Sequence, residues 1–256
     1  MKGRQIVLGR IFGREAAALM LDGQLEDLIL DPAGATPLAP GAICRAKVDR
    51  LVKGPGGVFL RLPEGARGYL RDRAGLREGQ SLVVQVNGSA EEGKAIPVSS
   101  RLNFRGRNLI VTPGTPGVNV SRRIRDEALR EELVQMGESA LAGITEPPGI
   151  VFRSIAAATA EDEVAAELDE LLALAQAVAS DRDGAPELLL DAPEPAEQAW
   201  QDWVDPAPDS IEDGEDAFEA TGAAEAVRQM LRPRLELGGG AWAEIEALRA
   251  LVAIDV

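Results

Sequence analysis

Five short segments decide the fold of this chain: AICRAKVDRLV at residues 42–52, GGVFLRL at 56–62, GYLR at 68–71, SLVVQVN at 81–87 and AIPVSS at 95–100. Each is rich in aliphatic or β-branched residues, and the intervals between them hold the Gly and Pro that favour turns. Five brief strands within about 60 residues are typical of a small closed β-barrel of the oligonucleotide-binding type. The pattern therefore predicts such a barrel over residues 42–99.

The segments on either side of the barrel predict a mixed α+β protein. Before it, we expect three strands joined by turns at Gly13 and at Asp22-Gly23. After it, strands alternate with helices, and Thr159-x-x-Asp162 resembles a capping box at the start of one helix. Residues 205–222 are acidic and short of aliphatic residues, and we expect them to form a loose surface loop. The predicted strands are 5–11, 15–21, 24–30, 108–112, 149–153, 187–191, 234–237, 241–246 and 250–255, and the predicted helices are 126–136, 160–178, 197–204 and 225–231.

Charge is distributed unevenly along the chain. The net charge is −15, which taken alone argues against a nucleic-acid partner. Residues 1–130, however, hold 21 Lys and Arg against 13 Asp and Glu, whereas residues 131–256 hold 6 against 29. Binding of a polyanion depends on local positive potential, so the basic first half is where we expect a polyanion to bind. The alternative interpretation is an acidic protein with a random local excess of arginine.

The residues that are missing exclude several classes of site. The chain has no histidine, so it has no Ser-His-Asp triad, Cys-His dyad or imidazole metal site. Its single cysteine, Cys44, excludes an intrachain disulfide, and its place in a predicted strand favours a buried structural thiol. No apolar run approaches the roughly 18 residues of a membrane span. The N-terminus carries Arg10, Arg14 and Glu15 where a signal peptide is apolar, so we expect a cytoplasmic protein without membrane contact.

Four groups of segments, in order along the chain, resemble the ribonuclease E/G family, in its compact form without a long C-terminal scaffold. They are GAICRAKVDRLV (41–52) with GGVFLRLPEGARGYL (56–70), GRNLIVTP (106–113) with VNVSRRIRDE (118–127), GIVFRS (149–154), and GGGAWAEIEALRALVAIDV (238–256). The resemblance implies an α+β multi-subdomain protein. A ribonuclease-H-like subdomain (1–38 and 184–234) would be interrupted by an S1 barrel of the oligonucleotide-binding type (39–99) and a 5′-sensor region (100–183). A DNase-I-like catalytic subdomain would begin at 235, and the chain is expected to end inside it.

In the barrel, Phe59 and Tyr69 match the two aromatic positions that this family uses to stack on RNA bases. Lys94 matches a family lysine near the RNA path, and basic residues near the aromatic pair would hold phosphates. The alternative for Phe59 is a place in the apolar core. The flanking basic residues are Lys53, Arg61, Arg67, Arg71 and Arg73.

The resemblance also implies a site for the 5′-monophosphate of RNA. Arg153 and Ser154 match the Arg-Thr pair that binds this phosphate in the family, with Ser in place of Thr, and Gly106 and Ile110 match the partner strand. Arginine suits a phosphate monoester because its planar fork can bond two oxygens. Alternatively, Arg153 forms a structural ion pair with one of the carboxylates at 161–163. Arg122 and Arg123, which follow Ser121, either contact the RNA backbone or cap and pair at the start of a helix.

Asp255 matches the first metal-binding aspartate of the family's catalytic site, where Mg²⁺ would activate water. The second aspartate and an asparagine of that site have no counterpart here, and Ala247, Leu248 and Arg249 stand where the family has polar residues. The zinc-linking cysteine pair of longer relatives is also missing, so an oligomer would not be joined by zinc. We therefore expect this chain to bind RNA without cleaving it.

Three hypotheses follow. In the first, the chain belongs to a metal-dependent endoribonuclease that prefers single-stranded, 5′-monophosphorylated RNA and acts in RNA processing. In the second, it is a non-catalytic RNA-binding or regulatory module. The third is an acidic α+β adaptor whose arginines are solvated surface residues.

Overall fold

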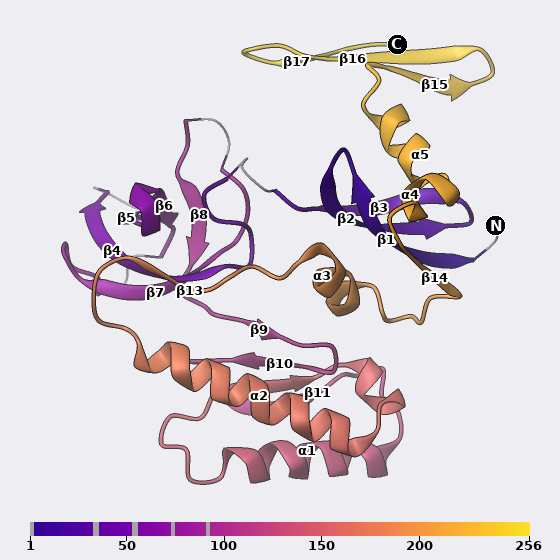
Figure 1. Cartoon of the computed structure of the whole chain (residues 1–256). Helices are drawn as coiled ribbons and strands as arrows, with labels where there is room; N and C mark the ends of the chain where they lie inside the picture. The colour runs from indigo at the N-terminus through magenta and orange to yellow at the C-terminus, as the bar shows by residue number, and fades with distance from the viewer. Residues whose placement is uncertain (1–2, 33–35, 53–55, 73–74, 91–92) are drawn as a thin grey trace. The chain divides into compact units, whose positions relative to one another are not determined.

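The chain divides into two units, shown in the computed structural model of Figure 1, which describes residues 3–32, 36–52, 56–72, 75–90 and 93–256. One unit combines residues 1–31 with 206–256, and the other comprises residues 32–205. The predicted Lys53 and Arg73 lie outside the described residues.

The first unit is built on a four-stranded sheet in the order β14-β1-β2-β3. Strands β1 (Arg4–Ile11), β2 (Arg14–Leu21) and β3 (Gln24–Leu30) form an antiparallel meander, as the sequence predicts. Each hairpin turns through two residues with positive φ, Phe12-Gly13 and Asp22-Gly23, which is the geometry that matches the twist of paired strands.

The acidic segment 205–222 is not the loose loop expected from its composition. Residues Ser210–Asp213 form β14, which pairs in parallel with β1, and Ala217–Ala220 form the short helix α4. Phe218 of α4 is 1% exposed and packs with Val7 and Met20 of the sheet. One aromatic residue and the pairing of β14 therefore outweigh the acidic composition.

A helix and a second sheet complete this unit. Helix α5 (Ala223–Met230) packs its Ala224 and Val227 into the same core as Phe218. Strands β15 (Arg234–Gly238), β16 (Ala241–Ala247) and β17 (Val252–Asp255) then form a separate three-stranded antiparallel sheet. All three strands agree with the predicted segments to within two residues.

The second unit contains the closed five-stranded barrel. The strands are β4 (Ile43–Leu51), β5 (Val58–Arg61), β6 (Arg67–Leu70), β7 (Ser81–Val86) and β8 (Ile96–Ser99), with a short 3-10 turn, η1, at Pro63–Gly65. They pair in the order β4-β5-β6-β8-β7, and β7 returns to β4 to close the barrel. Side chains alternate along each strand, so that Val58, Leu60 and Leu70 fill the interior while Phe59 and Tyr69 face outward. The predicted barrel of the oligonucleotide-binding type fits this closed fold.

Next along the chain is a second sheet covered by two helices, in the order β11-β12-β10-β9. Helices α1 (Glu127–Leu141) and α2 (Glu161–Ser180) lie beside this sheet in Figure 1 and share its apolar core, to which Leu133, Phe152 and Leu168 contribute. Strands β9 and β11 were not predicted from the sequence, since they are short and largely polar or glycine-containing. The strands are β9 (Phe104–Arg105), β10 (Leu109–Thr112), β11 (Gly117–Val120) and β12 (Gly149–Phe152).

The return of the chain after α2 joins this sheet region to the barrel. Strand β13 (Glu187–Leu190) pairs with β4, and helix α3 (Pro195–Asp202) follows it. The guanidinium of Arg45 in β4, 5% exposed, forms ion pairs with Asp181 and Glu187 and donates from Nε to the carbonyl oxygen of Ala185 at 2.7 Å. Residues 184–205 therefore belong with the barrel to the unit that comprises residues 32–205.

None of the helices in the described part of the chain combines the length and the apolar character needed to cross a bilayer.

Cys44 is fully buried in β4, and burial raises the pKa of its thiol to about 12. Because the thiolate is the reactive form, we expect a thiol reagent at pH 8 to leave the folded protein unmodified. After unfolding in guanidinium chloride the same cysteine should react fully, which a colorimetric thiol assay measures. Rapid stoichiometric modification of the folded protein would contradict the buried position.

Candidate nucleic-acid interface

The outer face of the barrel carries the two aromatic residues singled out in the sequence. Phe59 of β5 and Tyr69 of β6 are direct cross-strand neighbours, and their ring centroids lie 5.5 Å apart with the planes inclined by 56°. Both side chains are half-buried, and Phe59 points away from the barrel interior, so the alternative that it belongs to the core is not supported. The Tyr69 hydroxyl accepts a hydrogen bond from the Gly57 amide at 3.2 Å, which fixes one end of the pair.

Arginine side chains flank this aromatic pair. The guanidinium carbons of Arg50 and Arg67 lie 5.2 and 5.9 Å from the centroid of Phe59, within the range of a cation–π contact. Arg61 is partly neutralised by Asp49 at 3.5 Å, and Arg71 is exposed just after β6. Lys94 is exposed in the turn before β8. The face thus combines two rings with exposed positive charge.

The second predicted site lies where β12 ends. Arg153 follows β12 directly and precedes the 3-10 helix η2 (Ser154–Ala158). Its Nη1 donates to the carbonyl oxygens of Gly106 and Arg107 at 3.0 and 3.1 Å, and its backbone N–H donates to the carbonyl of Asn108 at 2.8 Å. The turn between β9 and β10 therefore holds Arg153 in place. The alternative ion pair with a carboxylate at 161–163 does not form among the described residues.

Glu167 of α2 organises that turn from the opposite side. Its carboxylate accepts from the Asn108 backbone N–H at 2.9 Å, from Asn108 Nδ2 at 2.7 Å and from the Leu109 N–H at 3.4 Å. Thr159 Oγ1 completes the network by donating to Asn108 Oδ1 at 2.8 Å. Asn108 is only 3% exposed, so these bonds satisfy polar groups that water does not reach.

Thr159 consequently does not form the predicted capping box. Helix α2 begins at Glu161 with Ala160 as its N-cap, and no side chain caps it. The Thr159 hydroxyl instead donates toward Asn108 Oδ1 and the carbonyl oxygen of Ile155. A tertiary hydrogen bond has replaced the local one that the spacing indicated.

Burial lowers the pKa of the Arg153 guanidinium, and repulsion from Arg105 adds to that effect. Asp202, Asp205 and Glu167 act in the opposite direction, which places three carboxylates in the electrostatic surroundings of Arg153. An arginine has so high an intrinsic pKa that the group stays charged at neutral pH. The site is therefore a charged guanidinium, half-buried and surrounded by acidic groups.

Ser154 is engaged by one of those carboxylates. Its hydroxyl hydrogen-bonds to Oδ2 of Asp205, and the same oxygen accepts from Nη1 of Arg123 at 3.1 Å. Arg122, beside it, is exposed. The alternative that this region caps helix α1 is not supported either, because Asp126 caps that helix by accepting from Ala128 and Leu129.

The structure brings some of the predicted residues together and leaves others apart. Gly106, Ile110, Arg153 and Ser154 lie on or beside the paired strands β10 and β12, with Ile110 opposite Val151. Phe59 and Tyr69 form a separate pair on the barrel.

Asp255 ends β17, where it is exposed and lies opposite Glu244. A Mg²⁺ ion bound by protein needs several oxygen ligands at once. Over the described part of the chain, however, no three or more acidic, cysteine or histidine side chains gather as a metal site would require. These residues thus do not fit a magnesium centre, and no metal-dependent step can be built on them.

Several residues near Arg153 were not recognised from the sequence. They come from distant segments: Asn108 and Glu167 in the network, Trp200 beneath Arg107 at 5.7 Å, Asp202 paired with Arg105, and Asp205. Glu167 is one of many acidic residues on α2, and nothing local distinguishes it. The run EQAWQDWVD (197–205) carries two tryptophans among polar residues. It is the one sequence signal that could have indicated a role for residues 197–205 near Arg153.

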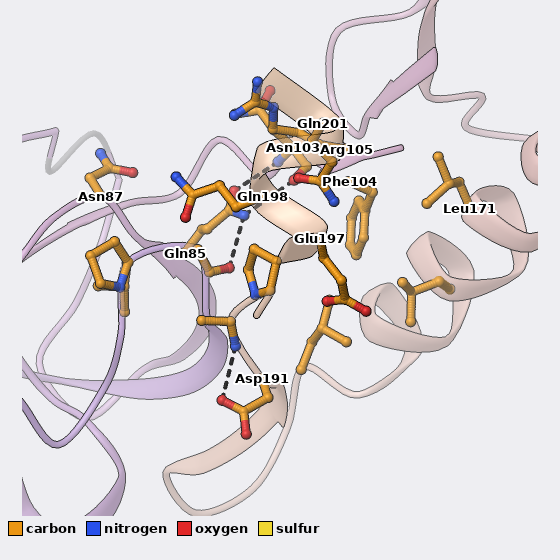
Figure 2. A pocket seen from close by; sticks show the side chains of 17 residues that line it. Gln85, Asn87, Asn103, Phe104, Arg105, Leu171, Asp191, Glu197, Gln198 and Gln201 are labelled. Atoms are coloured by element: carbon orange, nitrogen blue, oxygen red, sulfur yellow. Dashed lines mark hydrogen bonds between the residues drawn. The ribbon is translucent and has the colours of Figure 1, made fainter. Parts of the chain in front are cut away.

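A cavity of about 600 Å³ is lined by residues of the barrel and of the segment 191–201, which follows β13. Figure 2 shows the polar side chains around it, among them Gln85, Asn103, Arg105 and Gln198. The Gln85 side chain holds the walls of the cavity together. Its Oε1 accepts from the backbone N–H of Asn103, and its Nε2 donates to the carbonyl oxygens of Asn103 and Gly41. The cavity contains none of the residues predicted to bind RNA.

Gly106 has no room for a side chain. A Cβ atom there would lie 1.9 Å from Oε1 of Glu167, so the carboxylate would have to release Asn108. We expect Gly106→Ala to destabilise the protein by about 1–3 kcal/mol, the cost of leaving buried polar groups unpaired. Urea unfolding measures this, with Gly88→Ala as the control, because a Cβ at Gly88 meets only Pro97, at 3.7 Å. Equal stability of the two variants would contradict the role of Glu167.

Comparison with known families matches residues 103–212 to the Ribonuclease E/G family. The matched region runs from the start of β9 to β14 and includes Arg153, Ser154 and Asp205. A search of curated proteins finds no match to this chain. The family match agrees with the resemblance that the sequence motifs show over the same part of the chain.

Proposed function

We propose that this chain binds single-stranded RNA on the outer face of its barrel and recognises a 5′-monophosphate at Arg153 and Ser154, as part of an endoribonuclease. The match to a ribonuclease family supports RNA as the ligand and phosphodiester hydrolysis as the parent reaction. The observation that carries the proposal is the outward-facing pair of Phe59 and Tyr69 with Arg50 and Arg67 beside it.

The aromatic rings and arginines of the barrel face suit the unpaired bases and the phosphates of a single RNA strand. Every unpaired base has a π-face, and stacking on an aromatic ring contributes about 1–3 kcal/mol per base with little sequence preference. The neighbouring arginines would neutralise phosphates, so binding should weaken as the salt concentration rises. Lys94, Arg122 and Arg123 are exposed and would extend this contact along the strand.

Arg153 suits a terminal phosphate for a separate reason. Only Nη1 of its guanidinium is held by the backbone of Gly106 and Arg107. The remaining N–H groups could therefore bond a phosphate monoester in the fork geometry that arginine favours. Ser154 would add a hydroxyl donor, and Ile110 would provide the neighbouring wall of the site on the paired strand.

Cleavage of RNA needs groups that binding of RNA does not. Metal-dependent cleavage by Mg²⁺ would need further carboxylates to join Asp255 around one ion, and the described residues do not gather them. We therefore propose that this chain binds RNA without hydrolysing it, so that it behaves like a non-catalytic RNA-binding module. A ribonuclease-H-like fold for the unit containing β1–β3, and a catalytic subdomain starting near residue 235, are parts of the same proposal.

Removing either aromatic ring of the barrel should weaken RNA binding. We expect Phe59→Ala and Tyr69→Ala each to cost about 1–3 kcal/mol of binding free energy for a single-stranded oligonucleotide, through lost stacking. Fluorescence anisotropy with a labelled RNA measures the dissociation constants. Phe12→Ala is the matched control, because Phe12 is an exposed phenylalanine, at 59%, in the first unit. Unaltered affinity in both barrel variants would remove the barrel face from the proposal.

Arg153→Ala should abolish the advantage of 5′-phosphorylated over 5′-hydroxyl RNA and leave affinity for the 5′-hydroxyl strand unchanged. The ratio of the two dissociation constants is the measurement. Arg182→Ala serves as the control for loss of one positive charge, since Arg182 follows the far end of α2, about 30 Å along a helix of this length. A preference that survives in Arg153→Ala would rule out this residue as the phosphate ligand.

A further inference from the structure

We infer that Asp205 determines specificity at the phosphate site, because its carboxylate competes with the RNA 5′-phosphate for Ser154. This inference rests on the proposed recognition of a 5′-monophosphate at Arg153 and Ser154. It adds an internal competitor that weakens the binding of a phosphorylated end and sets how far such an end is preferred over a hydroxyl end.

The contacts of Ser154 give the first reason. A serine hydroxyl has a single hydrogen to donate, and in this structure it is directed to Oδ2 of Asp205. A phosphate oxygen also needs that hydrogen. Phosphate and an ionised Asp205 therefore cannot both be bonded by Ser154 at the same time.

The charges around Arg153 give the second reason. Asp202 is paired with Arg105, and Glu167 is held by the N–H groups of Asn108 and Leu109, so these two carboxylates have partners outside the site. Asp205 alone of the three is bonded to a residue assigned to the phosphate. A phosphate monoester carries nearly two negative charges at neutral pH, and its approach would be opposed by this carboxylate.

The position of Asp205 permits it to withdraw. Trp203 and Val204 are buried, at 5% and 3%, which anchors the backbone immediately before it. The Asp205 side chain is 28% exposed, and that of Arg123, bonded to the same oxygen, is 71% exposed. A rotation of the Asp205 side chain toward water would free Ser154 without moving the chain, and Arg123 could follow the carboxylate or turn to the RNA.

Asp205→Asn tests the inference in the full chain. The amide keeps the size of the side chain and removes the competing charge. Anisotropy titrations with a 5′-monophosphorylated and a 5′-hydroxyl oligonucleotide of one sequence give the ratio of the two dissociation constants. We expect this ratio to rise roughly three- to tenfold over the wild type, as for loss of one close charge. Asp169→Asn is the matched control, because it removes the same charge from an exposed position on α2 and should leave the ratio unchanged.

A second variant ties the effect to Ser154. Adding Ser154→Ala to Asp205→Asn should remove most of the gain, since the released hydroxyl is then absent. If Asp205→Asn fails to fold, Asp205→Ala replaces it, because alanine removes both the charge and the acceptor of the Ser154 hydrogen bond.

The outcomes distinguish the two proposals. A wild-type preference for phosphorylated RNA that Asp205→Asn leaves unchanged or lowers would overturn the competitor role and leave phosphate recognition intact. An equal gain for both RNAs would also overturn it, because charge alone would then explain the change. No preference in the wild type or in Asp205→Asn would overturn both proposals.

Discussion

The carboxylate of Glu167 accepts hydrogen bonds from the backbone and side chain of Asn108, and the proposed phosphate site depends on this interaction. Those bonds fix the turn between β9 and β10. The carbonyl oxygens of this turn accept hydrogen bonds from Nη1 and from the backbone N–H of Arg153. The absence of a side chain at Gly106 is a condition of the same arrangement, because the carboxylate occupies the space where a Cβ would lie. A helix, a turn and a strand end are thereby fixed around one guanidinium, which suits a group that must present itself to a ligand without reorganising.

Under the proposed function, the barrel would contribute a different kind of recognition. Its interior is filled by alternating aliphatic residues, and the same alternation places Phe59 and Tyr69 on the outside as neighbours. Stacking there would tolerate any base, whereas the site at Arg153 would distinguish a 5′-monophosphate from a 5′-hydroxyl at the end of an RNA. Arg45 connects the two regions, because its buried guanidinium in β4 is held by Asp181 and Glu187 on the segment that leaves α2. Under the proposed function, one unit of the chain would carry both the general RNA-binding surface and the contact specific to an RNA end.

Much of the fold could be predicted from the sequence because its signals are local. The barrel strands alternate and are separated by Gly and Pro, and Asp22-Gly23 fixes a hairpin by its own turn geometry. The errors arose where tertiary contacts override local preference. Phe218 and the pairing of β14 with β1 order the acidic segment 205–222. The Thr159 hydroxyl bonds to the Asn108 side chain and does not cap the start of α2. The pair Arg153-Ser154 was identified only through family resemblance, and its partners Glu167 and Asp205 carry no local signal, since each is one acidic residue among many.

Under the proposed function, Arg153 and Ser154 together form a site for a terminal phosphate. A crystal structure of this chain with a short 5′-monophosphorylated RNA tests it most directly. We expect the terminal phosphate within hydrogen-bonding distance of the Arg153 guanidinium and the Ser154 hydroxyl, the Asp205 side chain turned away, and a base stacked on Tyr69 or Phe59. A terminal phosphate bound elsewhere, with Ser154 still bonded to Asp205, would contradict the claim.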